Sequence, residues 1–218
     1  MKKIKVLNLY AGIGGNRKLW DNVEVTAVEN VPKIAKIYSD LFPEDKMLVV
    51  DAHQYLLDHY KEFDFIWSSP PCPTHSRMKP LQVKSKHKFN IKRTAEYPDM
   101  RLYQEILLLK HFFKGKWIVE NVVSYYDPLI KPAELYRHYF WSNFHIAECS
   151  SHILGIKKRD TIHSTTSELM NHYEIYPDFE KFDTRGLEKD QLVRNCVHPR
   201  LALHILKCAF KVKQEVLI

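Results

Sequence analysis

Apolar positions along the chain fall into short continuous runs and into longer segments with helical spacing. Five runs have the composition of strands and lie at 4–10, 25–29, 47–50, 63–69 and 117–119. Between them, residues 32–41, 52–60 and 100–113 repeat apolar side chains every three or four positions, which is typical of helices with one buried face. Strands that alternate with helices predict an α/β protein with a doubly wound, mostly parallel sheet.

The pattern predicts further elements around this alternation. A short helix is expected from the glycines near position 12 to about Trp20, and two closing strands are expected at 139–141 and 144–146. A last helix begins at Pro199, with a core stripe made by Leu201, Ile205, Cys208, Ala209 and Val212. At 218 residues, the chain is expected to form one domain over 1–218.

One apolar run ends in an unusual way. The strand at 63–69 stops at Pro70-Pro71, where fixed φ angles and missing N–H groups prevent its continuation, and Cys72 follows at once. Open α/β sheets bind ligands at the carboxyl ends of their strands, so a thiol there is well placed for chemistry. A lone cysteine is more often a small buried hydrophobe, and a chemical role for Cys72 therefore depends on its neighbours.

The first strand is followed by a glycine turn of the kind that holds cofactors. Tyr10-Ala11-Gly12-Ile13-Gly14-Gly15 allows positive φ angles and close backbone approach, although its spacing is not that of dinucleotide enzymes. Glu29 ends the second strand, where an acidic residue typically binds ribose hydroxyls. Asp51 follows the third strand, and Glu120-Asn121 closes the fifth.

The formal net charge of +7 is concentrated in one segment. Seven basic residues and no acidic ones lie between positions 77 and 93: Arg77, Lys79, Lys84, Lys86, Lys88, Lys92 and Arg93. Charge runs are usually solvated faces, but this one begins beside Cys72 and favours an anionic substrate. It belongs to a connection over 76–99 that is much longer than usual, which predicts a mobile, functional loop.

Other residue types narrow the possible classes. The four cysteines have no C-x-x-C spacing and the twelve histidines have no paired-ligand pattern, so neither a metal nor a disulfide framework is expected. This suits a reducing, cytoplasmic location. No apolar run approaches membrane-spanning length, so no membrane partner is expected.

Taken in order, these blocks resemble the C5 cytosine-specific DNA methyltransferase family. The similar segments are Leu9–Gly15, Glu29, Asp51, Pro71-Cys72, Glu120-Asn121-Val122, Arg137 within 136–140, Tyr176-Pro177-Asp178 and Asn195-Cys196-Val197. The resemblance implies a Rossmann-like class I fold that uses S-adenosylmethionine. It assigns cofactor binding to Tyr10, Ala11, Gly12, Gly14, Gly15, Glu29, Asn30, Asp51, Ala52, Pro71, Asn195 and Val197.

The same resemblance implies a reaction. Cys72 would add to C6 of cytosine, Glu120 would stabilise the charge that develops at N3, and Arg137 would bind the base's carbonyl oxygen or a phosphate. Nearby basic residues are expected to increase the thiolate fraction of Cys72. The target cytosine would be flipped out or single-stranded, because its reactive atoms are inaccessible within a duplex.

Several positions depart from the family pattern. Asn8 stands where an acid is common, Pro73 replaces a glutamine, Arg194 replaces a glycine, and Ala133 and Leu135 replace polar members of the arginine block. Only about 147–167 is available for the usual target-recognition domain, which is too short for a domain. The target sequence is therefore expected to be short or relaxed, unless a separate specificity subunit reads it. Lys157-Lys158-Arg159 in this insert is an alternative reader.

Three other functions stay open. Transfer-RNA enzymes share the expected fold and cysteine, so the substrate could be RNA. Ser69-Pro70-Pro71 is similar to the motif of exocyclic-amine methyltransferases, but Cys72 occupies the place of their aromatic residue. A nucleic-acid-binding subunit with a degenerate site is the non-enzymatic alternative, which the intact Gly12, Glu29 and Cys72 disfavour.

Overall fold

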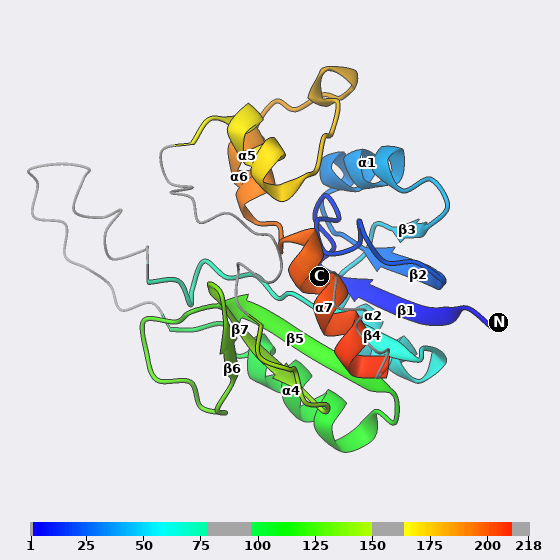
Figure 1. Ribbon diagram of the computed structural model, residues 1–218, viewed down its shortest axis with the longest axis vertical. Helices are drawn as coiled ribbons and strands as arrows, with labels where there is room; N and C mark the ends of the chain where they lie inside the picture. Colours follow the sequence, from blue (N-terminus) through cyan, green and yellow to red (C-terminus); the bar gives the residue numbers. More distant parts are fainter. Residues whose placement is uncertain (1, 78–96, 150–163, 211–218) are drawn as a thin grey trace, which may run out of the picture.

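The computed structural model describes residues 2–77, 97–149 and 164–210. Within these ranges, seven strands form one sheet in the order β3-β2-β1-β4-β5-β7-β6 (Figure 1). The strands are β1 (Ile4–Leu9), β2 (Val23–Val28), β3 (Lys46–Leu48), β4 (Phe65–Ser68), β5 (Lys116–Val122), β6 (Ala133–Leu135) and β7 (His138–Ser142). Strands β1 to β5 are parallel, and β7 runs antiparallel to both β5 and β6.

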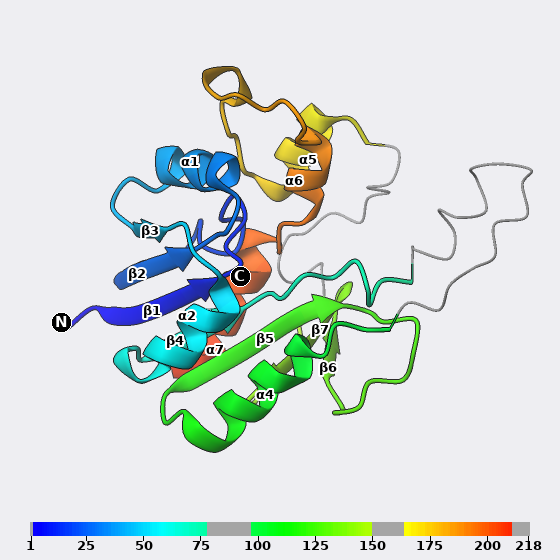
Figure 2. The same ribbon diagram turned by 180° about the vertical axis from the view of Figure 1, so that it is seen from behind.

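Helices cover both faces of this sheet. The helices are α1 (Pro32–Leu41), α2 (Ala52–His59), α4 (Arg101–Phe112), α5 (Thr166–Tyr173), α6 (Lys189–Arg194) and α7 (Pro199–Phe210), with 3-10 turns at Tyr60–Glu62 and Phe179–Lys181. Helix α7 lies in front of the sheet in Figure 1, and α2 and α4 lie on the opposite face in Figure 2. The fold is the Rossmann-like arrangement of S-adenosylmethionine-dependent methyltransferases, as predicted.

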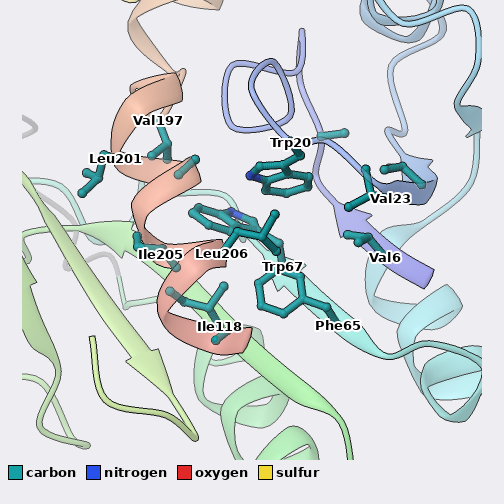
Figure 3. Close-up of a cluster of buried hydrophobic side chains, with 14 of the residues drawn as sticks. Val6, Trp20, Val23, Phe65, Trp67, Ile118, Val197, Leu201, Ile205 and Leu206 are labelled. Atoms are coloured by element: carbon teal, nitrogen blue, oxygen red, sulfur yellow. The ribbon is translucent and has the colours of Figure 1, made fainter. Parts of the chain in front are cut away.

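The central strands are apolar because both of their faces are covered. On one face, Trp67 of β4 is fully buried and contacts Trp20, with ring centroids 5.6 Å apart. Leu201 and Ile205 of α7 close the same cluster (Figure 3). On the other face, Leu56 of α2 packs with apolar residues of α4. The two clusters fix β1, β2 and β4 side by side, with their carboxyl ends at the same edge of the sheet.

A third apolar cluster joins the C-terminal helices to the glycine turn. Ile13 of the turn and Ile37 of α1 pack with Leu169 of α5, Val193 of α6 and Cys196. The segment before α7 therefore lies directly against the turn that follows β1, although about 180 residues separate them in the chain.

The structure corrects three local predictions. Residues 13–20 form successive turns and no helix, because Gly12 and Gly14 have φ angles of 54° and 81°. Residues 144–146 are not a strand; β6, which was not predicted, pairs with β7 and supplies the sheet edge. Strand β3 ends at Leu48, so Val49 and Val50 are exposed.

The predicted C-terminal stripe is confirmed in part. Leu201, Ile205 and Ala209 are buried, whereas Cys208 is only partly buried at the margin of the cluster. Val212 lies outside the described residues, as do most of the predicted basic loop (78–96) and of the shortened insert (150–163). In the described parts of the chain, no helix is long and apolar enough to cross a membrane.

Candidate active site

The glycine turn and Glu29 form one hydrogen-bonded unit at the ends of β1 and β2. The N–H of Gly12 donates to Oε2 of Glu29 at 3.1 Å, and the N–H of Val31 donates to Oε1 at 3.0 Å. Burial raises the pKa of the Glu29 carboxyl, and these backbone N–H groups oppose that rise. A carboxylate has about four acceptor sites, so Glu29 retains capacity for ribose hydroxyls.

The three glycines of the turn have different surroundings. A Cβ added at Gly12 would meet nothing within 4 Å. At Gly14 a Cβ would lie 2.3 Å from the Phe42 ring, and at Gly15 it would lie 2.4 Å from Cβ of Cys196. Gly14 and Gly15 are therefore required by protein packing, whereas the open space at Gly12 is the cradle that a bound cofactor can fill.

The remaining predicted cofactor residues lie around this cradle. Tyr10 has a φ of 54° and Ala11 is buried between β1 and β2. Asp51 caps α2, accepting the N–H of Gln54 at 2.8 Å, and the buried Ala52 begins that helix. Asn30 is exposed directly after Glu29. The donors and acceptors at these strand ends fit a nucleoside-containing cofactor.

The Asn195-Cys196-Val197 segment approaches the turn through its middle residue. Cys196 and Val197 are buried, and the packing of Cys196 on Gly15 brings this segment to the glycine turn. Asn195 is exposed at the C-cap of α6, where its Oδ1 accepts Nε2 of Gln191 at 2.5 Å. Arg194, the departure at this block, forms an ion pair with Asp190.

The departure at Asn8 has a structural account. Asn8 and Asn16 are both buried and exchange amide hydrogen bonds, with Nδ2 of Asn16 2.8 Å from Oδ1 of Asn8. A carboxylate at position 8 could accept but could not donate in return. The two asparagines thus satisfy each other inside the turn.

Glu105 is a site residue that the sequence analysis missed. This fully buried carboxylate of α4 accepts the Tyr10 hydroxyl at 2.6 Å and the Ser68 hydroxyl at 2.5 Å, and it lies 3.0 Å from Nδ1 of His53. It therefore joins the ends of β1 and β4 to α2. A charged residue within the apolar stripe of helix 100–113 was the available signal, because buried carboxylates require partners.

Cys72 follows β4, whereas Glu120 lies inside the adjacent strand β5, which continues to Val122 instead of closing at Glu120-Asn121 as predicted. The two segments are joined. Nδ2 of Asn121 donates to the Pro70 carbonyl at 3.0 Å. Glu120 is buried and its Oε1 lies 2.6 Å from Nδ1 of His138 on β7. His138 was also missed; it pairs with Val122 across the two strands and reaches Glu120 diagonally.

The described surroundings of Cys72 do not favour its thiolate. Burial and, secondly, the nearby Glu120 carboxylate raise the pKa of the Cys72 thiol to about 11. This opposes the expectation that basic neighbours increase the thiolate fraction. Arg77 is exposed, and Lys79, Lys84, Lys86, Lys88, Lys92 and Arg93 lie outside the described residues.

Arg137 lies in the turn between β6 and β7, at the sheet end where β5 finishes. Its Nη2 donates to the Tyr173 hydroxyl of α5 at 3.0 Å. Tyr136 before it has a φ of 60°, which presents this turn toward the C-terminal helices. No group of three potential metal ligands exists among residues 2–77, 97–149 and 164–210.

Comparisons with known proteins agree with this geometry. The family model of the C-5 cytosine-specific DNA methylases matches residues 4–123. A methyltransferase of Entamoeba histolytica, EhMeth, superposes with a TM-score of 0.57 at 13% identity, covering 97% of this chain and 99% of the other. A Spodoptera frugiperda DNMT2 variant gives 0.56 at 14% identity, covering 95% and 100%. No curated protein matches the sequence.

The fold and the strand-end site define a Rossmann-like methyltransferase of the class that uses S-adenosylmethionine. The family model spans more than half of the chain, and the chain belongs to the C-5 cytosine-specific DNA methylase family.

Proposed function

We propose that this protein transfers a methyl group from S-adenosylmethionine to C5 of cytosine in DNA, through an adduct between Cys72 and C6. One observation carries the proposal: the Cys72 thiol follows β4, and the buried Glu120 carboxyl lies near the end of the adjacent parallel strand β5, beside the Gly12 cradle. The amide of Asn121 joins the two segments. Cysteine and glutamate with these neighbours supply the nucleophile and the acid that the reaction requires.

The reaction needs both groups because C5 of cytosine is a weak nucleophile. Bonding of the Cys72 sulfur to C6, with a proton passing from Glu120 to N3, makes C5 electron-rich. S-adenosylmethionine, when bound, would supply an electrophilic methyl group to C5 and leave as S-adenosylhomocysteine. Loss of the C5 proton to a base, cleavage of the S–C6 bond and return of the N3 proton to Glu120 then restore the ring and both side chains.

The hydrogen bonding of Glu120 suits this proton transfer. His138 occupies Oε1 through Nδ1, which leaves Oε2 to carry a proton toward N3. Protonation of Glu120 also removes the negative charge that raises the pKa of Cys72. The acid form of Glu120 therefore favours the thiolate of Cys72, and the two groups become reactive together.

Other residues are proposed to hold the reactants. Glu29 would bind the ribose of the cofactor, and Asp51 would bind its adenine amine. Gly12, which has no side chain, would allow the protein backbone to approach the cofactor closely. Arg137, whose Nη2 donates to the Tyr173 hydroxyl, would bind the base oxygen or a phosphate through its planar guanidinium. The basic residues from Arg77 to Arg93 would bind phosphates and carry little sequence information.

The experiment is covalent trapping on matched substrates. Oligonucleotides of DNA and of RNA with 5-fluorocytosine at the same position are incubated with the protein and S-adenosylmethionine. We expect a denaturation-resistant complex with DNA, dependent on Cys72 and lost in Cys72→Ser. Trapping on the RNA oligonucleotide alone would show that the substrate is RNA and not DNA. Methylation of an exocyclic amine, or trapping that survives Cys72→Ala, would overturn the mechanism.

The reader of the target sequence needs a separate test. Sequencing of methylated positions on long random DNA is expected to give a short or relaxed target. Replacing Lys84, Lys86 and Lys88 by alanine should flatten the salt dependence of binding, by about 0.9 in log–log slope for each lost phosphate contact on duplex DNA. A long, fixed target read by the purified protein would argue for another reader, such as Lys157-Lys158-Arg159, and against a separate specificity subunit.

A further inference from the structure

His75, three residues after the proposed nucleophile, is buried at 1% exposure. Its backbone N–H donates to the Cys72 carbonyl at 2.9 Å, and its carbonyl accepts the N–H of Tyr125 at 3.1 Å. Its ring nitrogen Nδ1 lies 2.7 Å from the Tyr126 hydroxyl. His75 thus joins the Cys72 segment to the segment that follows β5, through its backbone and through its ring, beside the bridge between Ser76 and Ser124.

Donors and acceptors can be assigned along the hydrogen bonds that lead to Tyr126. The N–H of Leu129 donates to the Tyr103 hydroxyl at 3.1 Å, and that hydroxyl donates to Tyr126 at 3.3 Å. The Tyr126 hydroxyl, already an acceptor, has its own hydrogen left for Nδ1 of His75. The chain Leu129–Tyr103–Tyr126–His75 therefore favours a neutral imidazole whose Nδ1 accepts the Tyr126 hydroxyl and whose proton is on Nε2.

In the described parts of the chain, Nε2 of His75 is buried and has no hydrogen-bond partner. Its surroundings therefore offer no acceptor that would stabilise a charged ring. A second proton would have to enter at Nδ1, where it would remove the acceptor of the Tyr126 hydroxyl and place a charge in a buried site. Burial lowers the pKa of His75 in agreement with this.

The groups that face the ring can be named. Asp99, before α4, opposes the lowering of the pKa, but Asp99 is itself paired with Arg101, with Oδ2 and Nη2 2.6 Å apart. The Tyr126 hydroxyl faces the ring, Tyr103 of α4 contacts that hydroxyl, and Cys72 lies on the same segment as His75. The N–H of Asp99 also donates to Oγ1 of Thr74 at 2.9 Å, which holds the same segment from the other side.

We propose that His75 is a positioning residue: in its neutral Nε2–H form it docks the Cys72 segment onto the segment after Glu120, and its protonation releases Cys72. This deepens the proposed function, since His75 itself touches neither reacting group. Docking sets the separation of nucleophile and acid, so the rate of adduct formation should fall at acid pH while cofactor affinity is retained.

Two substitutions and a control separate this role from a merely structural one. His75→Asn keeps an acceptor near the Nδ1 position but cannot titrate, whereas His75→Leu removes the acceptor. Tyr126→Phe removes the donor and leaves His75 in place. His111→Asn changes an exposed histidine of α4 and serves as the matched control.

The first measurement is the trapping rate on 5-fluorocytosine DNA from pH 5 to 8, with cofactor affinity measured by calorimetry. We expect His75→Leu and Tyr126→Phe to trap roughly tenfold more slowly, the usual effect of one lost hydrogen bond. Because the Cys72 thiol titrates in every variant, all rates should fall toward acid pH. His75→Asn should retain the rate at pH 7.5 and decline less steeply than the native protein. Native rates in both His75→Leu and Tyr126→Phe would overturn the proposal.

The second measurement does not depend on the reaction. In histidine labelled with ¹⁵N, we expect a pyridine-type Nδ1 and a pyrrole-type Nε2 signal that is lost in His75→Asn and kept in His111→Asn. Iodoacetamide should alkylate the Cys72 peptide faster in His75→Leu. The opposite tautomer, or unchanged alkylation, would overturn the proposal even if no substrate were trapped. Absent trapping with both results as expected would instead count against the proposed function.

Discussion

His138 Nδ1 lies 2.6 Å from Glu120 Oε1, within the antiparallel pair formed by β7 and β5. Both side chains are buried, so the contact is shielded from water. Such a contact orients the carboxyl and determines which of its oxygens can face a substrate. We expect His138→Leu to lower the methyl-transfer rate by about tenfold or more, since a buried hydrogen bond to a charged group is worth roughly 1.5–3 kcal/mol. His138→Asn, which keeps a donor near Nδ1, should restore much of the rate in single-turnover assays.

The raised pKa of Cys72 can be measured in the free protein. With a thiol pKa of about 11, alkylation of Cys72 should be slow at pH 7 and should increase throughout the alkaline range. Glu120→Gln removes one cause of the shift, so the pKa should fall and alkylation at pH 8 should accelerate, while methyl transfer is lost. Glu24→Gln, at an exposed position of β2, is the control. Slower alkylation in Glu120→Gln would contradict this electrostatic coupling.

Glu29 should determine cofactor affinity. Glu29→Gln keeps the side-chain size but replaces one acceptor oxygen with an amide that opposes the N–H of Gly12 or Val31. We expect S-adenosylmethionine to bind about tenfold or more weakly by calorimetry, because charge-assisted hydrogen bonds are roughly twice as strong as neutral ones. Unchanged affinity for S-adenosylmethionine would contradict the assignment of ribose binding to Glu29.

Gly12 and Gly15 should respond differently to alanine. The added methyl at Gly12 would occupy the open cradle, so Gly12→Ala should weaken cofactor binding. The positive φ at this position should cost less free energy of unfolding than the variant loses in free energy of cofactor binding. At Gly15 the methyl would overlap Cys196, and we expect a stability loss of about 1–3 kcal/mol from overpacking. Urea unfolding and calorimetry on both variants distinguish the two effects. Equal stability losses would contradict the distinction.

The His53–Glu105 pair should make stability depend on pH. The hydrogen bond that the His53 imidazole donates to the Glu105 carboxylate is the largest cause of the raised pKa of His53. A raised folded-state pKa means that the contribution is complete below about pH 6.5, the unfolded value, and is lost as pH rises through the folded value. Urea midpoints from pH 5.5 to 9 should therefore decline more for the native protein than for His53→Gln. Parallel curves would exclude the effect.

The ends of β1 and β4 were predictable to within a residue because the residues that follow them are of unusual type, whereas the ends of β3 and β5 were not. Double proline before Cys72 and glycine after Tyr10 mark sharp stops, and the helix at 32–41 was found with its observed bounds. The edge of the sheet was not predictable: β6 has only three residues, two of them exposed, so it carries no apolar run. It forms because β7 presents an open edge to it.

The contacts of the site were harder to predict than its members. Glu105, His138 and His75 each act through a partner distant in the chain, and sequence patterns report burial rather than pairing. The pKa of Cys72 illustrates the difference. Basic residues nearby in sequence suggested a lowered value, whereas burial and Glu120, which lies 48 positions away in the numbering, raise it.

The contact of Gly15 with Cys196 has a consequence for synthesis on the ribosome. Translation completes β1 and its turn early, but the residue that packs on Gly15 is made about 180 positions later. A nascent chain shorter than this lacks one wall of the cofactor turn. Methyl-donor binding should then begin only after Cys196 has emerged from the ribosome, so that ligand capture follows the packing of this late segment onto the turn.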